Sequence, residues 1–504
     1  MFYIFVGNNK IGDVMELYSK LKSNIEHIKN TFVGADDIVF KEFNNKGTEC
    51  FLVYTDNIVN GSAIENAVLT NIMIRGEREN SAERFEQNLI SVGETSLAHS
   101  FEEVFDAVLL GDTVLLIADD KKAVIISTKN WPSRGIPEAQ TETVVQGPKD
   151  AFTEQGSINT VLIRRRIRDT ALKVKRMNCG RRSKTDVAVM YIKDIAREEL
   201  VREVIRQIES IDIDCIFSSG YMEQLLEKKH MSPFPQLQLT ERPDKASSAL
   251  YEGRVVVVVD NSPFVIILPS TLNIFFQSAE DYYERWEIMS FMRVLRFFSA
   301  FAAAFLPGLY IALTVYRPDL IPTTLALKIS ATRQYVPFPT IVEVLIMETA
   351  FELLREAGVR IPSPVSSAFG IVGGIVIGSA AVDAGIVGPA VVIIAALTGI
   401  CSFAVPNPSF VSAVRLIKYF VIFMSACLGL FGFYTALFCI LVHLSSLESF
   451  SVPYLYPFCS GSVNNYTDFK DSIIRVPIEK MIKRPIFANI SQKIRMKKRK
   501  DGKI

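Results

Sequence analysis

The residues of this sequence that are best suited to do chemistry are carboxylates in an otherwise apolar region. The segment 340–357 has helical periodicity and follows Pro339. At about 100° per residue, Glu343 lies on the apolar face of this helix, together with Met347 and Leu354. The opposite side carries a polar stripe made of Glu348, Glu352, Arg355 and Glu356.

Two interpretations of Glu343 stay open. It compensates the helix dipole in the first turn, or it is an intramembrane carboxylate that lines a water-filled path or pairs with a cation. We take Glu343, Glu348 and Glu352 as candidates for pore or gating residues. The sequence leaves open whether the helix 338–357 spans a bilayer, re-enters it or lies on its surface.

A ridge of small residues spaced four apart follows, and it consists of Ser366, Gly370, Gly374 and Gly378. On a helix these residues share one face, where a neighbouring helix can approach closely, as is usual in bilayers. We therefore predict helix packing, with a hinge or a pore-lining face as the alternative. A dinucleotide-binding glycine loop is excluded because no strand precedes the ridge.

Motifs for catalysis or metal binding are absent from the sequence. It has no GxSxG, HExxH, P-loop or CxxC pattern, and the four histidines are widely scattered. The seven cysteines are interpreted as free thiols, which act as small hydrophobes in apolar runs. We therefore expect neither an enzyme nor a bound cofactor or metal ion.

The elements that position these residues begin with two predicted cytoplasmic α/β subdomains, 1–160 and 186–292. In the first, strand composition occurs at 50–55, 113–117 and 123–126, and a polar turn at 119–122 predicts a hairpin. The second has an amphipathic helix at 198–210 and a run of five valines that suits a buried central strand. Its other predicted strands are 186–192, 215–217 and 264–268.

The segment 161–185 between them is densely basic. A nucleic-acid patch would also carry aromatic residues, and this run has none, so we expect no nucleic-acid partner. We interpret the segment as a linker or a solvated helix that joins the subdomains and touches anionic lipid head groups.

A transmembrane helical domain is predicted over 293–458. A bilayer core of about 30 Å requires about 20 apolar residues in a helix. Four segments without Asp, Glu, Lys or Arg contain that length: 297–316, 361–382, 384–414 and 419–447, although Asp383 follows the second directly. Pro406 and Pro408 are expected to end the third helix early. The predicted bundle thus has about four spans plus the amphipathic or re-entrant helix.

Basic residues predict the orientation of this domain. Arg293 and Arg296 precede the first span, and the tail 459–504 is strongly basic. By the positive-inside rule both termini face the cytoplasm, which requires an even number of crossings. Arg415 and Lys418 conflict mildly with this scheme, because they lie at the outer end of the fourth span. We expect them to snorkel to the interface or to face a wet interior.

Blocks of sequence in the region 185–458 resemble the A subunits of the GerA-type spore germinant receptors of endospore-forming bacteria. Together the blocks are specific to this family, whereas the first 160 residues match only in general pattern. One departure is Ser379, where the family usually has Gln. The matching blocks are SGYMEQ (219–224), SPFPQ (232–236), TERPD (240–244), EGR (252–254), QSAEDYY (277–283), LPGLY (306–310), VPFP (336–339), LREAGVR (354–360) and GIVGG (370–374).

The resemblance implies a role in nutrient-triggered germination, at the spore inner membrane. Such A subunits act with a transporter-like B subunit, which is thought to hold the nutrient, and with a lipoprotein C subunit. The A subunit is thought to form a homo-oligomer and a ligand-gated ion channel. The alternative hypothesis is a secondary transporter of a small nutrient or ion, although no internal repeat supports it. The nutrient, the permeant ion and the number of subunits are not specified by the sequence.

Overall fold

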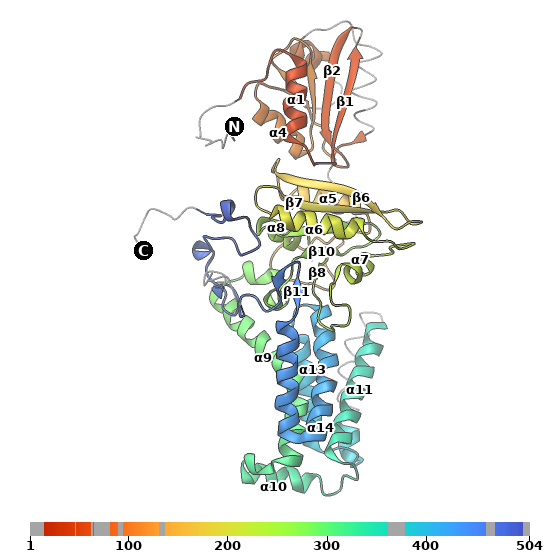
Figure 1. Ribbon diagram of the computed structural model, residues 1–504, viewed down its shortest axis with the longest axis vertical. Coiled ribbons are helices and arrows are strands. Elements are labelled where there is room, and N and C mark those ends of the chain that lie inside the picture. Colours follow the sequence, from red (N-terminus) through yellow and green to blue (C-terminus); the bar gives the residue numbers. More distant parts are fainter. Residues whose placement is uncertain are drawn as a thin grey trace, which may run out of the picture.

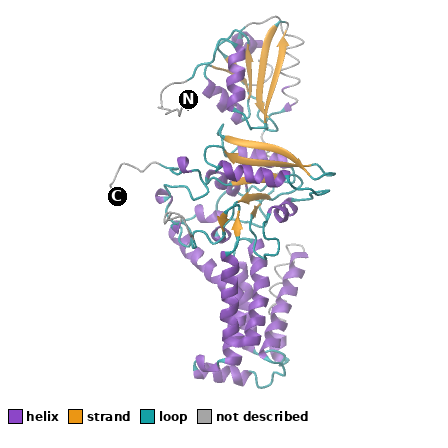
Figure 2. Cartoon of the chain, viewed as in Figure 1, coloured by secondary structure: helices purple, strands orange, loops and turns teal. Residues whose placement is uncertain are grey.

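The computed structural model describes residues 15–45, 47–61, 64, 81–88, 94–130, 137–360, 378–459 and 469–496. Three parts follow one another along its long axis: a first α/β unit, a second α/β unit and a helical bundle (Figure 1). Figure 2 shows strands in the two α/β units and a bundle built of helices alone. This order of parts agrees with the predicted fold class.

The first α/β unit is a five-stranded antiparallel sheet with the order β1-β2-β4-β5-β3. The predicted hairpin of β4 and β5 is confirmed, with Thr113 opposite Ile126. The elements of this unit are α1 (Leu21–Thr31), β1 (Ile38–Asn45), β2 (Thr48–Thr55), α3 (Ala82–Asn88), β3 (Thr95–Ala98), α4 (Phe101–Leu110), β4 (Thr113–Ile117) and β5 (Ala123–Ile126).

The second α/β unit has a five-stranded antiparallel sheet with the order β6-β7-β9-β10-β8. The five valines form β9 at its centre, and they are buried because apolar clusters cover both faces of the sheet. The segment 215–217, predicted as a strand, lies in the loop between two helices. The elements are α5 (Gly156–Arg164), β6 (Leu172–Cys179), β7 (Thr185–Ile192), α6 (Glu198–Glu209), α7 (Ser219–Leu226), β8 (Gln238–Thr240), α8 (Pro243–Tyr251), β9 (Val255–Val259) and β10 (Val265–Leu268).

The basic segment 161–185 is not the linker or solvated helix that we predicted. Helix α5 ends at Arg164, and the chain then forms β6, an edge strand of the second sheet. The alternation of apolar and basic residues at 172–175 has the period of a strand, and lysines are common on edge strands. Arg164 itself is buried and donates two hydrogen bonds, of 2.9 and 2.8 Å, to Asp37 of the first α/β unit. The segment therefore connects the two units by a buried ion pair.

The helical bundle contains α9 (Trp286–Ile311), which continues as a π-helical turn to Tyr316, α11 (Thr340–Arg360), α13 (Pro389–Phe403) and α14 (Pro408–Ser445). The short helix α10 (Thr323–Thr332) lies at the end of the bundle far from the α/β units (Figure 1). Among the described residues, Trp286–Tyr316 and Pro408–Ser445 are long and apolar enough to cross a membrane, and α13 is apolar but shorter.

Helix α14 is a hairpin of two helices rather than one straight helix. At Gly429 the backbone leaves the helical conformation, with φ of 61° and ψ of −139°. A straight helix would separate Phe410 from His443 by about 50 Å. Their ring centroids nevertheless lie 6.0 and 6.1 Å from the ring of Phe234. The chain therefore reverses at Gly429, a conformation that favours glycine, and Figure 1 shows the two blue arms.

This reversal corrects the predicted spans. The stretch 384–414 is divided between two helices, since α13 ends at Phe403 and α14 begins at Pro408. The stretch 419–447 begins inside α14 and includes the reversal, so two predicted spans correspond to three helices. Uninterrupted apolar composition gave no sign of the turn. Most of the predicted span 361–382 lies outside the described residues, and 340–360 form α11, which runs along the bundle (Figure 1).

The described part of the predicted basic tail folds back onto the second α/β unit, and we call residues 469–496 the C-terminal strap. Ala488 of the strap forms a β-bridge with Ala196, and the N–H of Asn489 donates to the carbonyl of Ile195 at 2.7 Å. A Cβ on Gly253 would lie 2.6 Å from the Cα of Ala488, so only glycine fits this approach. The small elements nearby are the 3₁₀ helices Leu272–Phe276, Ala279–Tyr282, Ile478–Lys480 and Ile490–Gln492, and the hairpin of β11 (Glu448–Ser449) and β12 (Val452–Pro453).

Candidate functional site

Charged side chains buried inside the helical bundle form the candidate site, and α11 positions most of them. The helix starts after Pro339, whose carbonyl accepts a hydrogen bond of 3.1 Å from the N–H of Glu343. Its apolar residues Val344 and Met347 are buried in a cluster to which α9, α13 and α14 also contribute. This packing turns Glu343, Glu348 and Glu352 toward the neighbouring helices, whereas Glu356 stays exposed.

Glu343 is fully buried near the far end of the bundle, with an exposed fraction of 0%. Its Oε1 accepts a hydrogen bond of 3.1 Å from Nε of Arg333, and Nη2 of the same arginine lies at ion-pair distance, 3.0 Å. Its Oε2 accepts a hydrogen bond of 2.7 Å from the N–H of Gly388, the residue that precedes α13. The carboxylate therefore neutralises a cation and also binds the positive end of the α13 dipole.

A second group of charges joins α11 to α14. Lys418 Nζ lies 2.5 Å from Oε2 of Glu348 and 3.3 Å from Oε1 of Glu352. Arg415 Nη1 lies 3.1 Å from Oε2 of Glu352. The side chains of Lys418 and Glu348 are only 5% and 2% exposed, so water does not screen this pair. Oε1 of Glu348 is buried and has no hydrogen-bond partner among the described residues.

Arg355 extends this group by one further turn of α11. Its guanidinium donates to the hydroxyl of Ser402 on α13 and stacks on the ring of Phe403, 4.6 Å from the centroid. Glu348, Glu352 and Arg355 thus form a row along one helix, and we call them, with Arg415 and Lys418, the α11 charge cluster. The cluster combines three cations with two carboxylates in an apolar bundle.

The structure brings together residues that the sequence left apart. Glu343, from the apolar face of α11, pairs with a cation, which is one of the two interpretations left open above. Glu348 and Glu352, from the polar stripe, bind Lys418 and Arg415. These two cations conflicted with the predicted orientation because they stood at an expected span boundary, whereas they lie inside α14. Charges of opposite sign within a largely apolar region were the signal for their pairing, because a buried charge needs a partner.

Of the predicted helix-packing ridge, only Gly378 belongs to the described residues, and Ser366, Gly370 and Gly374 lie outside them. A Cβ on Gly378 would lie 3.2 Å from Cγ1 of Val392 on α13, which indicates a close approach of the two segments. Sequence reasoning missed a second such glycine. A Cβ on Gly308 of α9 would lie 2.7 Å from Cγ1 of Val421 on α14.

Within the part of the chain that the structure describes, no group of His, Cys, Asp and Glu side chains could hold a metal ion. His443 lies at the end of the bundle near the α/β units, where its Nε2 is 2.9 Å from the hydroxyl of Ser232. The α11 charge cluster consists of lysine, arginine and glutamate side chains, so the chemistry that it can perform is electrostatic: it can bind, repel or exchange ions.

Comparisons with known proteins identify the family. The model of the Bacillus/Clostridium GerA spore germination protein family matches residues 26–487. Spore germination protein KA of Bacillus subtilis (strain 168) is 38% identical over 484 residues, which cover 95% of this chain and 88% of that protein. The uncharacterized membrane protein YfkQ of the same organism is 37% identical over 468 residues, which cover 92% of this chain and 90% of that protein.

Among solved structures, the crystal structure of the N-terminal domain of the A subunit of the Bacillus megaterium spore germinant receptor GerK3 is similar to this chain. It is 31% identical, with 52% of this chain and 99% of that chain covered and a TM-score of 0.42. A relative named as a membrane protein and two long apolar helices together favour a membrane location. The family model and the relatives extend over nearly the whole sequence, and the chain belongs to the GerA family of spore germination proteins.

Proposed function

We propose that this chain is the A subunit of a nutrient germinant receptor, and that it transduces nutrient binding into germination. In this proposal it forms a homo-oligomer that acts as a ligand-gated ion channel in the spore inner membrane. A transporter-like B subunit and a lipoprotein C subunit are its partners. Both termini face the cytoplasm, which agrees with a bundle whose α/β units and C-terminal strap lie at the same end (Figure 1).

The α11 charge cluster is the observation that carries this proposal. On insertion scales a charged residue at the centre of a membrane helix costs about 2.5–3.5 kcal/mol, so buried charges there are rare and usually functional. Lys418 and Glu348 are almost fully buried, and Oε1 of Glu348 keeps a free acceptor. A cluster that served packing alone would be replaced at little cost by apolar residues.

The small cavity within a single copy of the chain favours a gated ion path over a permanently open one. The cavity beside Glu348, Glu352 and Lys418 has a volume of about 20 Å³, which is room for about one water molecule. Ion flow therefore requires that the helices around the cluster separate, or that several copies form a path between them. Both requirements fit an oligomer that opens when a partner subunit binds the nutrient.

Spores that carry Glu348→Gln test the proposal. This change keeps the side-chain shape and removes a charge from the cluster, so we expect slower release of monovalent cations after nutrient addition in spores matched for the amount of this protein. Asp319→Asn is the matched control, since Asp319 also pairs with an arginine, Arg317 at 2.9 Å, but is exposed. Identical release kinetics for Glu348→Gln and the parent would contradict the proposal.

Reconstitution separates the channel from the alternative, a secondary transporter. Vesicles that contain this chain with its B and C subunits should show an ion current when nutrient is added. Accumulation of nutrient inside the vesicles, coupled to an ion gradient and without such a current, would favour the transporter.

A further inference from the structure

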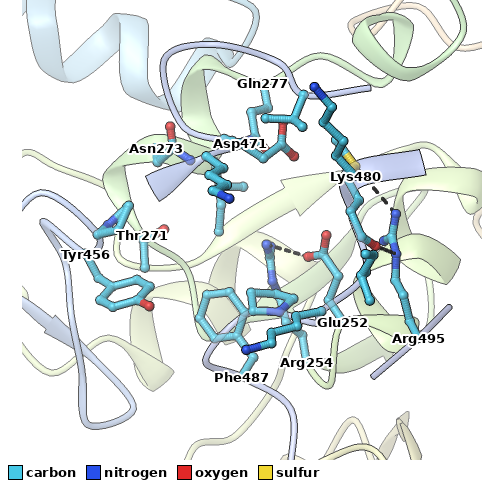
Figure 3. A pocket seen from close by; sticks show the side chains of 18 residues that line it. Glu252, Arg254, Thr271, Asn273, Gln277, Tyr456, Asp471, Lys480, Phe487 and Arg495 are labelled. Atoms are coloured by element: carbon cyan, nitrogen blue, oxygen red, sulfur yellow. Dashed lines mark hydrogen bonds and ion pairs between the residues drawn. The ribbon is translucent and has the colours of Figure 1, made fainter. Parts of the chain in front are cut away.

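A cavity of about 290 Å³ lies between the second α/β unit and the C-terminal strap, away from the α11 charge cluster. Glu252 and Arg254 line it from the turn between α8 and β9, and Asn273 and Gln277 line it from the segment before α9. The strap closes the other side (Figure 3). The cavity thus lies where the second α/β unit leads into α9.

The walls of this cavity are strongly basic. The carboxylates that line it are Glu252 and Asp471, which leaves a net charge of +3. Asp471 is already engaged, because it accepts hydrogen bonds of 2.9 Å from Arg293 and 2.8 Å from the hydroxyl of Tyr282. The cations that line the cavity are Arg254, Lys470, Lys480, Lys483 and Arg495.

Arg254 is the fixed part of the site. Its side chain is 7% exposed, stacks on the ring of Phe487 at 4.6 Å and donates one hydrogen bond of 2.8 Å to Glu252. Its Nε is buried and has no acceptor among the described residues. Figure 3 shows Arg254 and Glu252 pointing into the cavity from the same wall. A buried guanidinium with an unused donor is costly unless an acceptor binds it.

We propose that this cavity binds a phosphate group, as a phosphate monoester or diester. Phosphate oxygens match the planar donors of an arginine and the point charges of lysines. The volume suits a small phosphate ester or a lipid head group, and the apolar side chains of Ile274, Tyr456 and Phe487 can cover the ester's carbon atoms. The site goes beyond the proposed channel, since a ligand here would fix the strap against the unit that leads into α9.

The test uses the full-length protein in detergent and follows its thermal unfolding midpoint. Inorganic phosphate and glycerol phosphate should raise the midpoint in a saturable way, and chloride at the same ionic strength should not. Arg254 is buried, so its removal also perturbs folding, and the test variant is therefore the double change Lys480→Gln and Lys483→Gln, at two exposed residues. We expect it to weaken the apparent affinity by about tenfold or more, since the loss of even one charged contact is worth about that factor.

Lys493→Gln is the matched control, because Lys493 belongs to the same strap but does not line the cavity. A second arm distinguishes the sources of phosphate by comparing maltoside micelles, which contain no phosphate, with and without added phosphatidylglycerol. Stabilisation by phosphatidylglycerol that the double variant loses would identify a lipid head group, whereas stabilisation by glycerol phosphate alone would identify a soluble ester. The proposal is overturned if the double variant and the control respond alike in both arms, or if chloride raises the unfolding midpoint as much as phosphate does.

Discussion

Replacing Lys418 by methionine is the most direct test of the α11 charge cluster. The substitution keeps the length of the side chain and removes its charge. Lys418 lies 2.5 Å from Glu348 and 3.3 Å from Glu352, so it is shared by two carboxylates. After the change Glu352 keeps Arg415 at 3.1 Å, but Glu348 keeps no cation that the structure places within ion-pair distance.

The expected loss of stability follows from this difference between Glu348 and Glu352. Removing one partner of a buried ion pair costs about 3–5 kcal/mol, which is the expected loss for Lys418→Met. Glu348→Gln leaves Lys418 bound to Glu352, so the loss is that of one charged hydrogen bond, about 1.5–3 kcal/mol. The double variant leaves two neutral side chains in contact, and we expect it to recover part of the loss caused by Lys418→Met.

Thermal unfolding of the detergent-purified protein measures these differences, with the monodisperse fraction that remains after heating as the readout. At about 2–4 °C per kcal/mol, Lys418→Met should lower the Tm by about 6–20 °C. Arg317→Met, which breaks the exposed pair with Asp319, is the control and should cause no measurable shift. The reasoning is refuted if Glu348→Gln is as destabilising as Lys418→Met, or if the double variant loses the sum of both.

Three further changes test other parts of the structure. Gly429→Leu should abolish the monodisperse peak of the protein on size-exclusion chromatography, because φ is 61° and a Cβ would lie 2.7 Å from Tyr316. Gly399→Leu should keep this peak, because the space around its Cβ is open. Arg164→Met should lower the free energy of unfolding by about 3–5 kcal/mol, because it leaves Asp37 buried and unpaired. Arg176→Met, which breaks an exposed pair, should lower it by only about 0–1 kcal/mol, and equal Tm shifts for the two variants would contradict this. Glu343→Gln should alter ion release, because Arg333 loses its counter-charge, but not the protein level, because the amide oxygen still accepts the hydrogen bond from Gly388. Unchanged ion release would argue against a role of Glu343 in ion movement.

The sequence predicted elements well where local composition decides them. The strands β4 and β5 have the predicted bounds, because each is a short run of β-branched and aliphatic residues at a polar turn. The segment 161–185 was misjudged because its number of charges was considered and its two-residue period was not. The reversal in α14 depends on the backbone of one glycine, and an apolar run gives no other sign of it.

The candidate site was predicted only in part, because its pairs are distant in sequence. The helical wheel identified Glu343 as unusual, but its partner Arg333 precedes α11 and is ten residues away. Lys418 is 70 residues from Glu348, and their pairing depends on the packing of α14 against α11. A periodicity analysis of one helix describes its faces and does not identify the helix that each face meets.

The position of the strap has a consequence for synthesis on the ribosome. The β-bridge of Ala196 needs Ala488, and Gly253 packs on the same residue, so the second α/β unit is incomplete until the chain has been made as far as Ala488. At bacterial or eukaryotic elongation rates of about 5–20 residues per second, the interval between Gly253 and Ala488 is roughly 10–50 s. The helices of the bundle, within residues 286–445, are made during this interval, while the surface that the strap will cover is still exposed. A chaperone that shields this surface should therefore raise the yield of the full-length protein more than that of the bundle alone.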